Sequence, residues 1–95
     1  MNIELVGTLK VIFAKEKISD KMDKQNLVVT IDENTPYHQD ILVQVINKNI
    51  EKVSQSGVKM GDKVRVKCNL RGKESKTETG SKYFNQVDLW EISKG

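Results

Sequence analysis

An unbroken alternation of apolar and polar side chains limits this chain to a fold built from strands. In the segment Lys63–Arg71 every second residue is apolar, and the residues between them are almost entirely cationic. Side chains of a strand point alternately to its two faces, so a period of two predicts a strand with one buried face and one solvated face. The inward positions are Val64, Val66, Cys68 and Leu70.

A second alternation begins near the N-terminus. The odd positions of Ile3–Phe13 are apolar, apart from Gly7, and form one apolar face along a long strand. A glycine inside a strand is typical of a bend or bulge, so Gly7 predicts the point where this strand passes between two sheets. Three further strands are expected at Leu27–Ile31, Ile41–Ile46 and Lys82–Ile92. In the last of these, one face holds Val87 and Leu89, and the other holds Phe84, Trp90 and Ile92.

Polar segments separate these strands. Ala14–Lys24 and Gly72–Ser81 carry closely spaced charges and are expected to be exposed loops. Asp32–Pro36 is expected to end a strand, because proline fixes its own backbone and restricts the residue before it.

One segment has the period of a helix. Ile46, Ile50 and Val53 fall on one face of a helix of about two turns. Asn47 or Asn49 is a candidate cap for its start, and Ser56–Gly57 is expected to end it.

The expected order is three strands, one short helix and two strands. This order in 95 residues is the plan of a five-stranded OB-fold barrel, an all-β fold with one short helix, and we expect residues 1–95 to form a single OB-fold domain. An SH3-like barrel or a β-sandwich also fits the alternation, but the position of the helix favours the OB-fold.

The positive charge is concentrated in the second half of the chain. The formal net charge is +3, yet residues 59–82 hold eight basic and three acidic residues, and the rest holds eight basic and ten acidic ones. A basic segment on a near-neutral body indicates a polyanionic partner, although a solvated surface would have the same composition.

The same half resembles a known family. The segments Gly61–Val66, Asn69–Glu74 and Gly80–Asn85, followed by Trp90, resemble small bacterial and phage single-stranded DNA-binding (SSB-like) proteins. The resemblance covers about Val58 to Ile92. It implies an OB-fold that binds single-stranded DNA without reading its sequence.

The chain departs from that family at two places. Ser75 stands where an aromatic residue often offers a stacking surface. The sequence also stops at Gly95, directly after the last expected strand, so we expect no acidic tail of the kind that recruits partners.

Binding a single strand without sequence preference requires cations for the phosphates and flat rings for the bases. The expected cations lie on the strand at Lys63–Arg71 and beyond it, and should point outward together: Lys63, Arg65, Lys67, Arg71, Lys73 and Lys82. The candidate rings are Tyr37, Tyr83 and Phe84, and one of the adjacent pair Tyr83 and Phe84 should be exposed. Phe13 is expected in the core, and Trp90 either packs or stacks.

No arrangement of residues indicates catalysis. Cys68 belongs to an apolar strand face and is expected to be buried, so no disulfide or reactive thiol is predicted. His38 is the only histidine and is expected to be a solvated loop residue. No metal-ligand or phosphate-loop spacing is present. We expect no enzyme activity, no cofactor and no metal, and, without a visible signal peptide or membrane span, a cytoplasmic protein.

Two functions fit these features of the sequence. The first is binding of single-stranded DNA, or of RNA, in replication, recombination or repair, by a protein that forms homo-oligomers. The second is an OB-fold interaction module or assembly subunit that does not itself bind nucleic acid. Oligosaccharide binding is less well supported, because the rings are few and the cations many.

Overall fold

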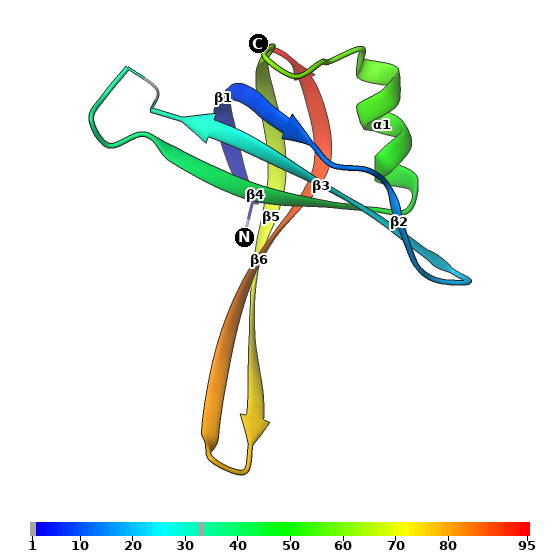
Figure 1. Cartoon of the computed structure of the whole chain (residues 1–95), viewed down its shortest axis with the longest axis vertical. Coiled ribbons are helices and arrows are strands. Elements are labelled where there is room, and N and C mark those ends of the chain that lie inside the picture. The colour runs from blue at the N-terminus through cyan, green and yellow to red at the C-terminus, as the bar shows by residue number, and fades with distance from the viewer. Residues whose placement is uncertain (1, 33) are drawn as a thin grey trace.

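The computed structural model describes residues 2–32 and 34–95 and consists of six strands and one helix (Figure 1). The elements are β1 (Asn2–Ile12), β2 (Glu16–Ser19), β3 (Met22–Ile31), β4 (Gln39–Ile46), α1 (Lys48–Ser56), β5 (Lys63–Thr77) and β6 (Gly80–Lys94). The predicted strand end at Asp32–Pro36 includes Glu33, which lies outside the described residues, and β3 ends at Ile31.

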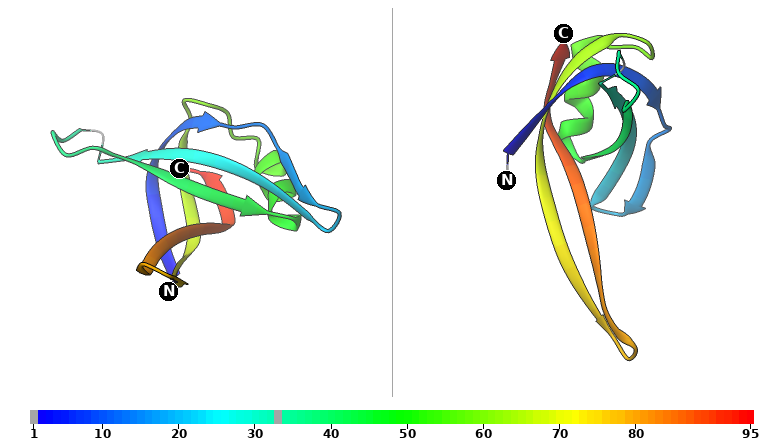
Figure 2. Two further views of the ribbon diagram at one scale, coloured as in Figure 1. Left: turned by 60° about the horizontal axis from the view of Figure 1, so that its bottom comes forward. Right: turned by 90° about the vertical axis from the view of Figure 1, so that its left-hand side faces the viewer.

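The strands form one sheet that closes on itself. Their order is β1-β5-β6-β4-β3-β2, and an additional pairing of β1 with β3 completes a barrel. All pairings are antiparallel except the one between β4 and β6. The helix α1 connects β4 to β5 and lies against β6 (Figures 1 and 2). The predicted five-stranded OB-fold is confirmed, with the short strand β2 added to it.

The core fills the barrel with medium-sized aliphatic side chains. Val64, Val66 and Cys68 of β5 are fully buried, as the alternation predicts, whereas Leu70, the fourth predicted inward residue, is 36% exposed. The buried core residues are Leu9, Leu27, Val29, Val43, Val45, Ile50, Val53, Val58, Val64, Val66, Cys68, Leu89 and Ile92.

Burial also determines the reactivity of the single thiol. Removal from water raises the pKa of Cys68 to about 12, and the nearby carboxylate of Asp88 adds to this rise. The thiolate is the nucleophile, so iodoacetamide at pH 8 should modify Cys68 only as fast as the barrel opens. Mass spectrometry of the native protein should show almost no adduct while protein in urea is labelled fully. Rapid native labelling would contradict the buried position.

β1 exchanges one partner strand for another near its middle. It pairs with β5 up to Thr8 and with β3 from Thr8 onward, so the strand changes partners next to Gly7, within one sheet and not between two. The bulge itself lies between Leu9 and Val11. One extra residue reverses the faces of everything after it, so Ile12 packs against the core while Phe13 is 47% exposed. The prediction that Phe13 lies in the core is wrong for this reason.

A second bulge changes the faces of β6. Lys67 pairs with Glu91 and Cys68 pairs with Leu89, which leaves Trp90 without a partner in the register. Leu89 and Ile92 are therefore both buried, although strict alternation places them on opposite faces. Trp90 is half-buried, with the Lys67 ammonium 5.7 Å from its ring centroid.

Both segments predicted as loops contain strands. β2 pairs with the start of β3 within Ala14–Lys24, and β5 and β6 remain paired through Gly72–Ser81 to a turn at Thr77–Gly80. These hairpins have no core behind them, so neither of their faces needs to be apolar. The alternation that marks a half-buried strand is therefore missing from their sequences.

The helix follows its predicted pattern except at its start. Ile50 and Val53 are buried, and Gly57 ends α1 in the left-handed conformation with φ 75°. Asn47 occupies the cap position, but its side-chain oxygen accepts a hydrogen bond from the Asp23 backbone N–H instead of capping the helix. Asn49 donates to the Leu89 carbonyl and joins α1 to β6.

Candidate nucleic-acid interface

The longest projection of the molecule is the outer part of the β5–β6 hairpin, residues 72–85, which we call the arm. Figures 1 and 2 show it extending well beyond the barrel, with its turn at Thr77–Gly80 farthest away. Almost every residue of the arm is exposed. The arm is held by strand pairing, so it places side chains in solvent without needing a core.

One face of the arm brings together three of the predicted binding residues. Lys73 lies directly opposite Phe84 in the strand register, and Lys82 lies opposite Ser75, the next residue on that face. The Phe84 ring is 56% exposed. Within the described residues neither lysine forms an ion pair. The face therefore offers an exposed ring beside two uncompensated positive charges.

Tyr83 projects from the opposite face of the arm. Its ring is 74% exposed, and its hydroxyl donates a 2.8 Å hydrogen bond to Glu74 across the hairpin. This bond restricts the ring to one orientation. Both members of the Tyr83–Phe84 pair are thus exposed, whereas we expected one, because the arm has no buried face.

The cations on the barrel part of β5 point outward as predicted, but they are not a bare positive stripe. Arg65 is 3.0 Å from Glu4 of β1, Lys67 is 3.1 Å from Glu91 of β6, and Arg71 is 3.2 Å from Asp88 of β6. Lys63 is exposed at the start of the same strand. Arg65, Lys67 and Arg71 therefore have less charge available to a phosphate than Lys73 and Lys82 on the arm.

The remaining candidate ring lies elsewhere. Tyr37 is exposed in the connection between β3 and β4, which Figures 1 and 2 show at the opposite end of the molecule from the tip of the arm. The structure therefore does not bring Tyr37 together with Tyr83 and Phe84.

The outer face of β3 and β4 carries polar groups that were not among the predicted binding residues. Next to the arm this face is hollowed into a groove whose lining includes Asn26, Gln44 and the exposed side chain of Leu42. The signal in the sequence is that β3 and β4 each have an amide residue two positions away from an apolar residue. It became informative only once the register placed Asn26 opposite Gln44.

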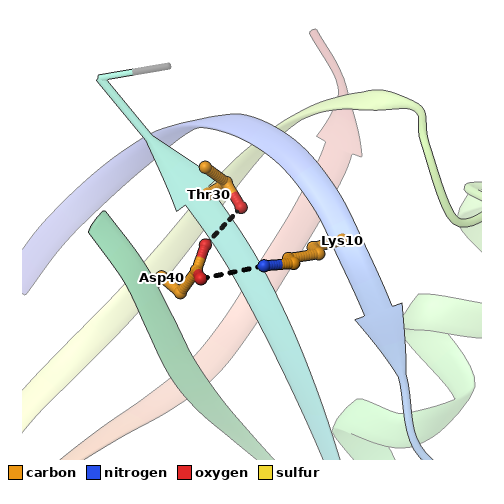
Figure 3. A network of polar contacts seen from close by, with 3 residues as sticks. All are labelled: Lys10, Thr30 and Asp40. Carbon is orange, nitrogen blue, oxygen red and sulfur yellow. Dashed lines mark hydrogen bonds and ion pairs between the residues drawn. The ribbon is translucent and has the colours of Figure 1, made fainter. Parts of the chain in front are cut away.

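A polar network holds the other end of this face (Figure 3). Thr30 donates a 2.6 Å hydrogen bond to one oxygen of Asp40, and the Lys10 ammonium lies 3.0 Å from the other oxygen. The hydroxyl and then the ammonium stabilise the ionised carboxylate, so the pKa of Asp40 lies below its usual value of 3.8. The network joins β1, β3 and β4 where the barrel closes.

This lowered pKa predicts an acid-dependent contribution to stability. A carboxyl whose pKa is lower in the folded state stabilises the protein above its unfolded-state pKa, and the contribution is lost as the pH falls through the folded value. Asp40→Asn should therefore lower the Tm near pH 7. The difference from the wild type should shrink below about pH 4. A difference that stays constant down to pH 2 would contradict this assignment.

The described residues contain neither a metal-ligand cluster nor a membrane-spanning helix. No three of their histidine, cysteine, aspartate or glutamate side chains are grouped so that they could hold a metal ion. None of their helices is long and apolar enough to cross a membrane.

Comparisons with solved structures identify the same fold in other proteins. The mitochondrial single-stranded DNA-binding protein Rim1 of S. cerevisiae superimposes with a TM-score of 0.76 at 13% identity, over 99% of this chain and 93% of Rim1. The N-terminal domain of PriB from Thermoanaerobacter tencongensis, described as dimeric, gives 0.68 at 15% identity, over 99% and 94%. The predicted likeness to SSB-type OB-folds is confirmed at the level of fold.

Sequence comparisons identify a family. No curated protein sequence matches the chain. A family model matches residues 4–93, nearly the whole chain, and this range includes all or most of every strand. The protein therefore belongs to the family described as "Domain of unknown function (DUF3127)".

Proposed function

We propose that the protein binds single-stranded DNA without strong sequence preference. Its ligand is the single-stranded DNA that replication, recombination or repair exposes. The observation that carries the proposal is the arm face on which the Phe84 ring lies beside Lys73 and Lys82. A ring that stacks on a base is worth about 1–3 kcal/mol whatever the base, and flanking cations attract the phosphates. Such a face therefore favours a flexible single strand over a duplex, whose bases are already stacked.

The other predicted residues have secondary roles in this proposal. Tyr83 offers a second ring on the opposite side of the arm. Arg65, Lys67 and Arg71 extend the path along the barrel, but each must exchange a carboxylate partner for a phosphate. Lys63 lies at the far end of β5. Tyr37 contacts the DNA only if the DNA strand crosses the barrel.

The position of the arm in the fold supports the proposal. OB-folds bind oligonucleotides on the face of their second and third barrel strands and on the loops that flank it, including the loop between the last two strands. Here that face belongs to β3 and β4, and that loop is the arm. Rim1, which has the same fold, is described as a single-stranded DNA-binding protein.

Fluorescence anisotropy with a labelled oligo-dT of about 30 nucleotides tests the proposal. We expect micromolar or tighter binding at low salt and weaker binding to a duplex of equal length. Each phosphate contact on a single strand contributes about −0.7 to the slope of log K against log salt, so about five contacts should give about −3.5. An oligo-rU of the same length measures any preference for RNA. Absence of binding at low salt would overturn the proposal and favour an interaction module.

We also propose that two copies pair through β1. Residues Asn2–Gly7 pair with β5 on one side, and within the described residues their other edge has no partner strand. A free edge with an exposed Val6 is a template for a second strand. Light scattering after gel filtration should give the mass of a dimer. Val6→Lys should give the monomer, since charges on an edge oppose pairing. If the wild-type protein has the mass of a monomer, the proposed pairing of two copies through β1 is wrong.

A further inference from the structure

The groove on the outer face of β3 and β4 lies where β4 diverges from β6 at the foot of the arm. β4 and β6 are paired only at Gln44 and Asp88, and beyond that point β6 continues into the arm. The groove has a volume of about 150 Å³. It is lined by Lys24, Asn26, Leu42, Gln44, Asn85, Gln86 and Val87.

Most polar residues that line this groove have amide side chains. Within the described residues, most of these amides form no hydrogen bond. Gln86 donates a 2.9 Å hydrogen bond to Asp88. The side chains of Asn26, Gln44 and Asn85 form no hydrogen bond within the described residues. The oxygen of Asn26 is buried and has no partner. A buried acceptor that is left unpaired is unusual in a folded protein and calls for a specific explanation.

We infer that this groove receives one unstacked base of the bound strand and that it prefers adenine. The inference rests on the proposed binding of single-stranded DNA. A primary amide places an acceptor beside a donor, and adenine presents its amino group beside a ring nitrogen, which is why Asn and Gln pair with adenine through two hydrogen bonds. Cytosine offers such a pair on one edge only, and thymine reaches an amide only through its ring N3–H and a carbonyl oxygen. Adenine offers the pair on two edges and has the larger ring system, and both properties favour adenine.

The size and shape of the groove fit this occupant. Its volume is well below the roughly 300–1,000 Å³ of sites for drug-sized ligands, so it suits a single ring system better than a larger ligand. Leu42 and Val87 provide apolar contact for the faces of the ring, and Lys24 places a cation nearby. Rotation about the broad terminal torsion of Asn26 would turn its oxygen toward the base.

Three labelled single strands of about 30 nucleotides test the inference in the anisotropy assay: oligo-dT, a repeat of TTTA and a repeat of TTTC. The repeats keep the strand flexible and offer an adenine or a cytosine in one of every four registers. We expect the TTTA repeat to bind at least about 5-fold more tightly than oligo-dT, which is the lower end of what one two-bond contact provides. The TTTC repeat should bind less tightly than the TTTA repeat and at least as tightly as oligo-dT, because cytosine has the amino group but a smaller ring.

Three variants locate the preference. Asn26→Leu should reduce the ratio between the TTTA repeat and oligo-dT to about one, while binding to oligo-dT persists. Asn85→Ala, at an exposed position, should also reduce the ratio and serves if Asn26→Leu does not fold. Gln39→Leu is the matched control, because it removes an exposed amide of β4 outside the groove and should leave the ratio unchanged.

The outcomes separate the two proposals. Equal binding of all three strands by the wild type would overturn the adenine groove while the proposed function stands. Tighter binding of the TTTC repeat than of the TTTA repeat would also overturn it. The same holds if the affinity ratio between the TTTA repeat and oligo-dT is unchanged in both Asn26→Leu and Asn85→Ala. Absence of binding to every strand would overturn the proposed function and the inference with it.

Discussion

Replacing Gly7 by alanine is expected to lower the Tm by about 12–24 °C. A Cβ atom at Gly7 would overlap the backbone carbonyl oxygen of Thr30 and lie 2.9 Å from its carbonyl carbon. Backbone atoms inside a closed barrel cannot move aside as a flexible side chain can. Overpacking of this kind costs about 1–3 kcal/mol or more, and we expect about 3 kcal/mol here. Thermal unfolding followed by circular dichroism measures the change.

The matched control is Gly72→Ala on the arm. Its added Cβ would have only the side-chain oxygen of Asn85 within range, at 3.8 Å, which is an ordinary contact. The same chemical change should therefore leave the Tm within about 2 °C of the wild type, as for most surface substitutions. If Gly7→Ala were equally harmless, β1 could not pass as close to β3 as the structure shows.

Reversing two charges on the arm is expected to reduce the affinity for oligo-dT at least about tenfold at low salt. Lys73→Glu with Lys82→Glu removes both cations beside Phe84 and places repulsive charges there. The loss of two phosphate contacts should also make the slope of log K against log salt shallower by about 1.4. Anisotropy titrations at several salt concentrations give both quantities.

The control carries the same change in net charge elsewhere. Lys48→Glu with Lys59→Glu alters the first residue of α1 and the connection that follows it, which Figure 1 shows on the barrel and away from the arm. We expect both the affinity and the salt slope of this variant to remain within about twofold of the wild type. Equal losses in the two double variants would mean that the net charge, and not the arm, governs binding.

The sequence predicts best those elements that have one buried face. The alternation of Val64, Val66 and Cys68 and the helical spacing of Ile50 and Val53 each require burial on one side, and the structure confirms both. The strand order and the position of the helix then favour the OB plan over an SH3-like barrel or a β-sandwich. These features are predictable because hydrophobic periodicity is a local signal.

The errors arise where the fold departs from strict alternation. The bulges near Lys10 and at Trp90 each insert one residue, so that Phe13 turns outward and Ile92 turns inward. A bulge is selected by how a strand fits its partners, and those partners are distant in the sequence. The two hairpins predicted as loops were missed because a strand exposed on both faces has no apolar period.

The site was predicted in composition but not in arrangement. Lys73, Lys82 and Phe84 share a face only because the register of β5 and β6 continues far beyond the barrel. The acidic partners of Arg65, Lys67 and Arg71 come from β1 and from the end of β6, so the residues that flank these cations in the chain do not indicate their neutralisation.

The chain separates into residues that pack the barrel core and residues of the arm that are available to a ligand. Every buried core residue lies outside residues 72–85, whereas Lys73, Lys82 and the exposed rings Tyr83 and Phe84 lie within them. Changes in the length or chemistry of the arm therefore leave the barrel's packing intact. A designer could graft other recognition sequences between Gly72 and Asn85 and retain the same scaffold, and an evolving lineage has the same freedom to change its ligand without first repairing its fold.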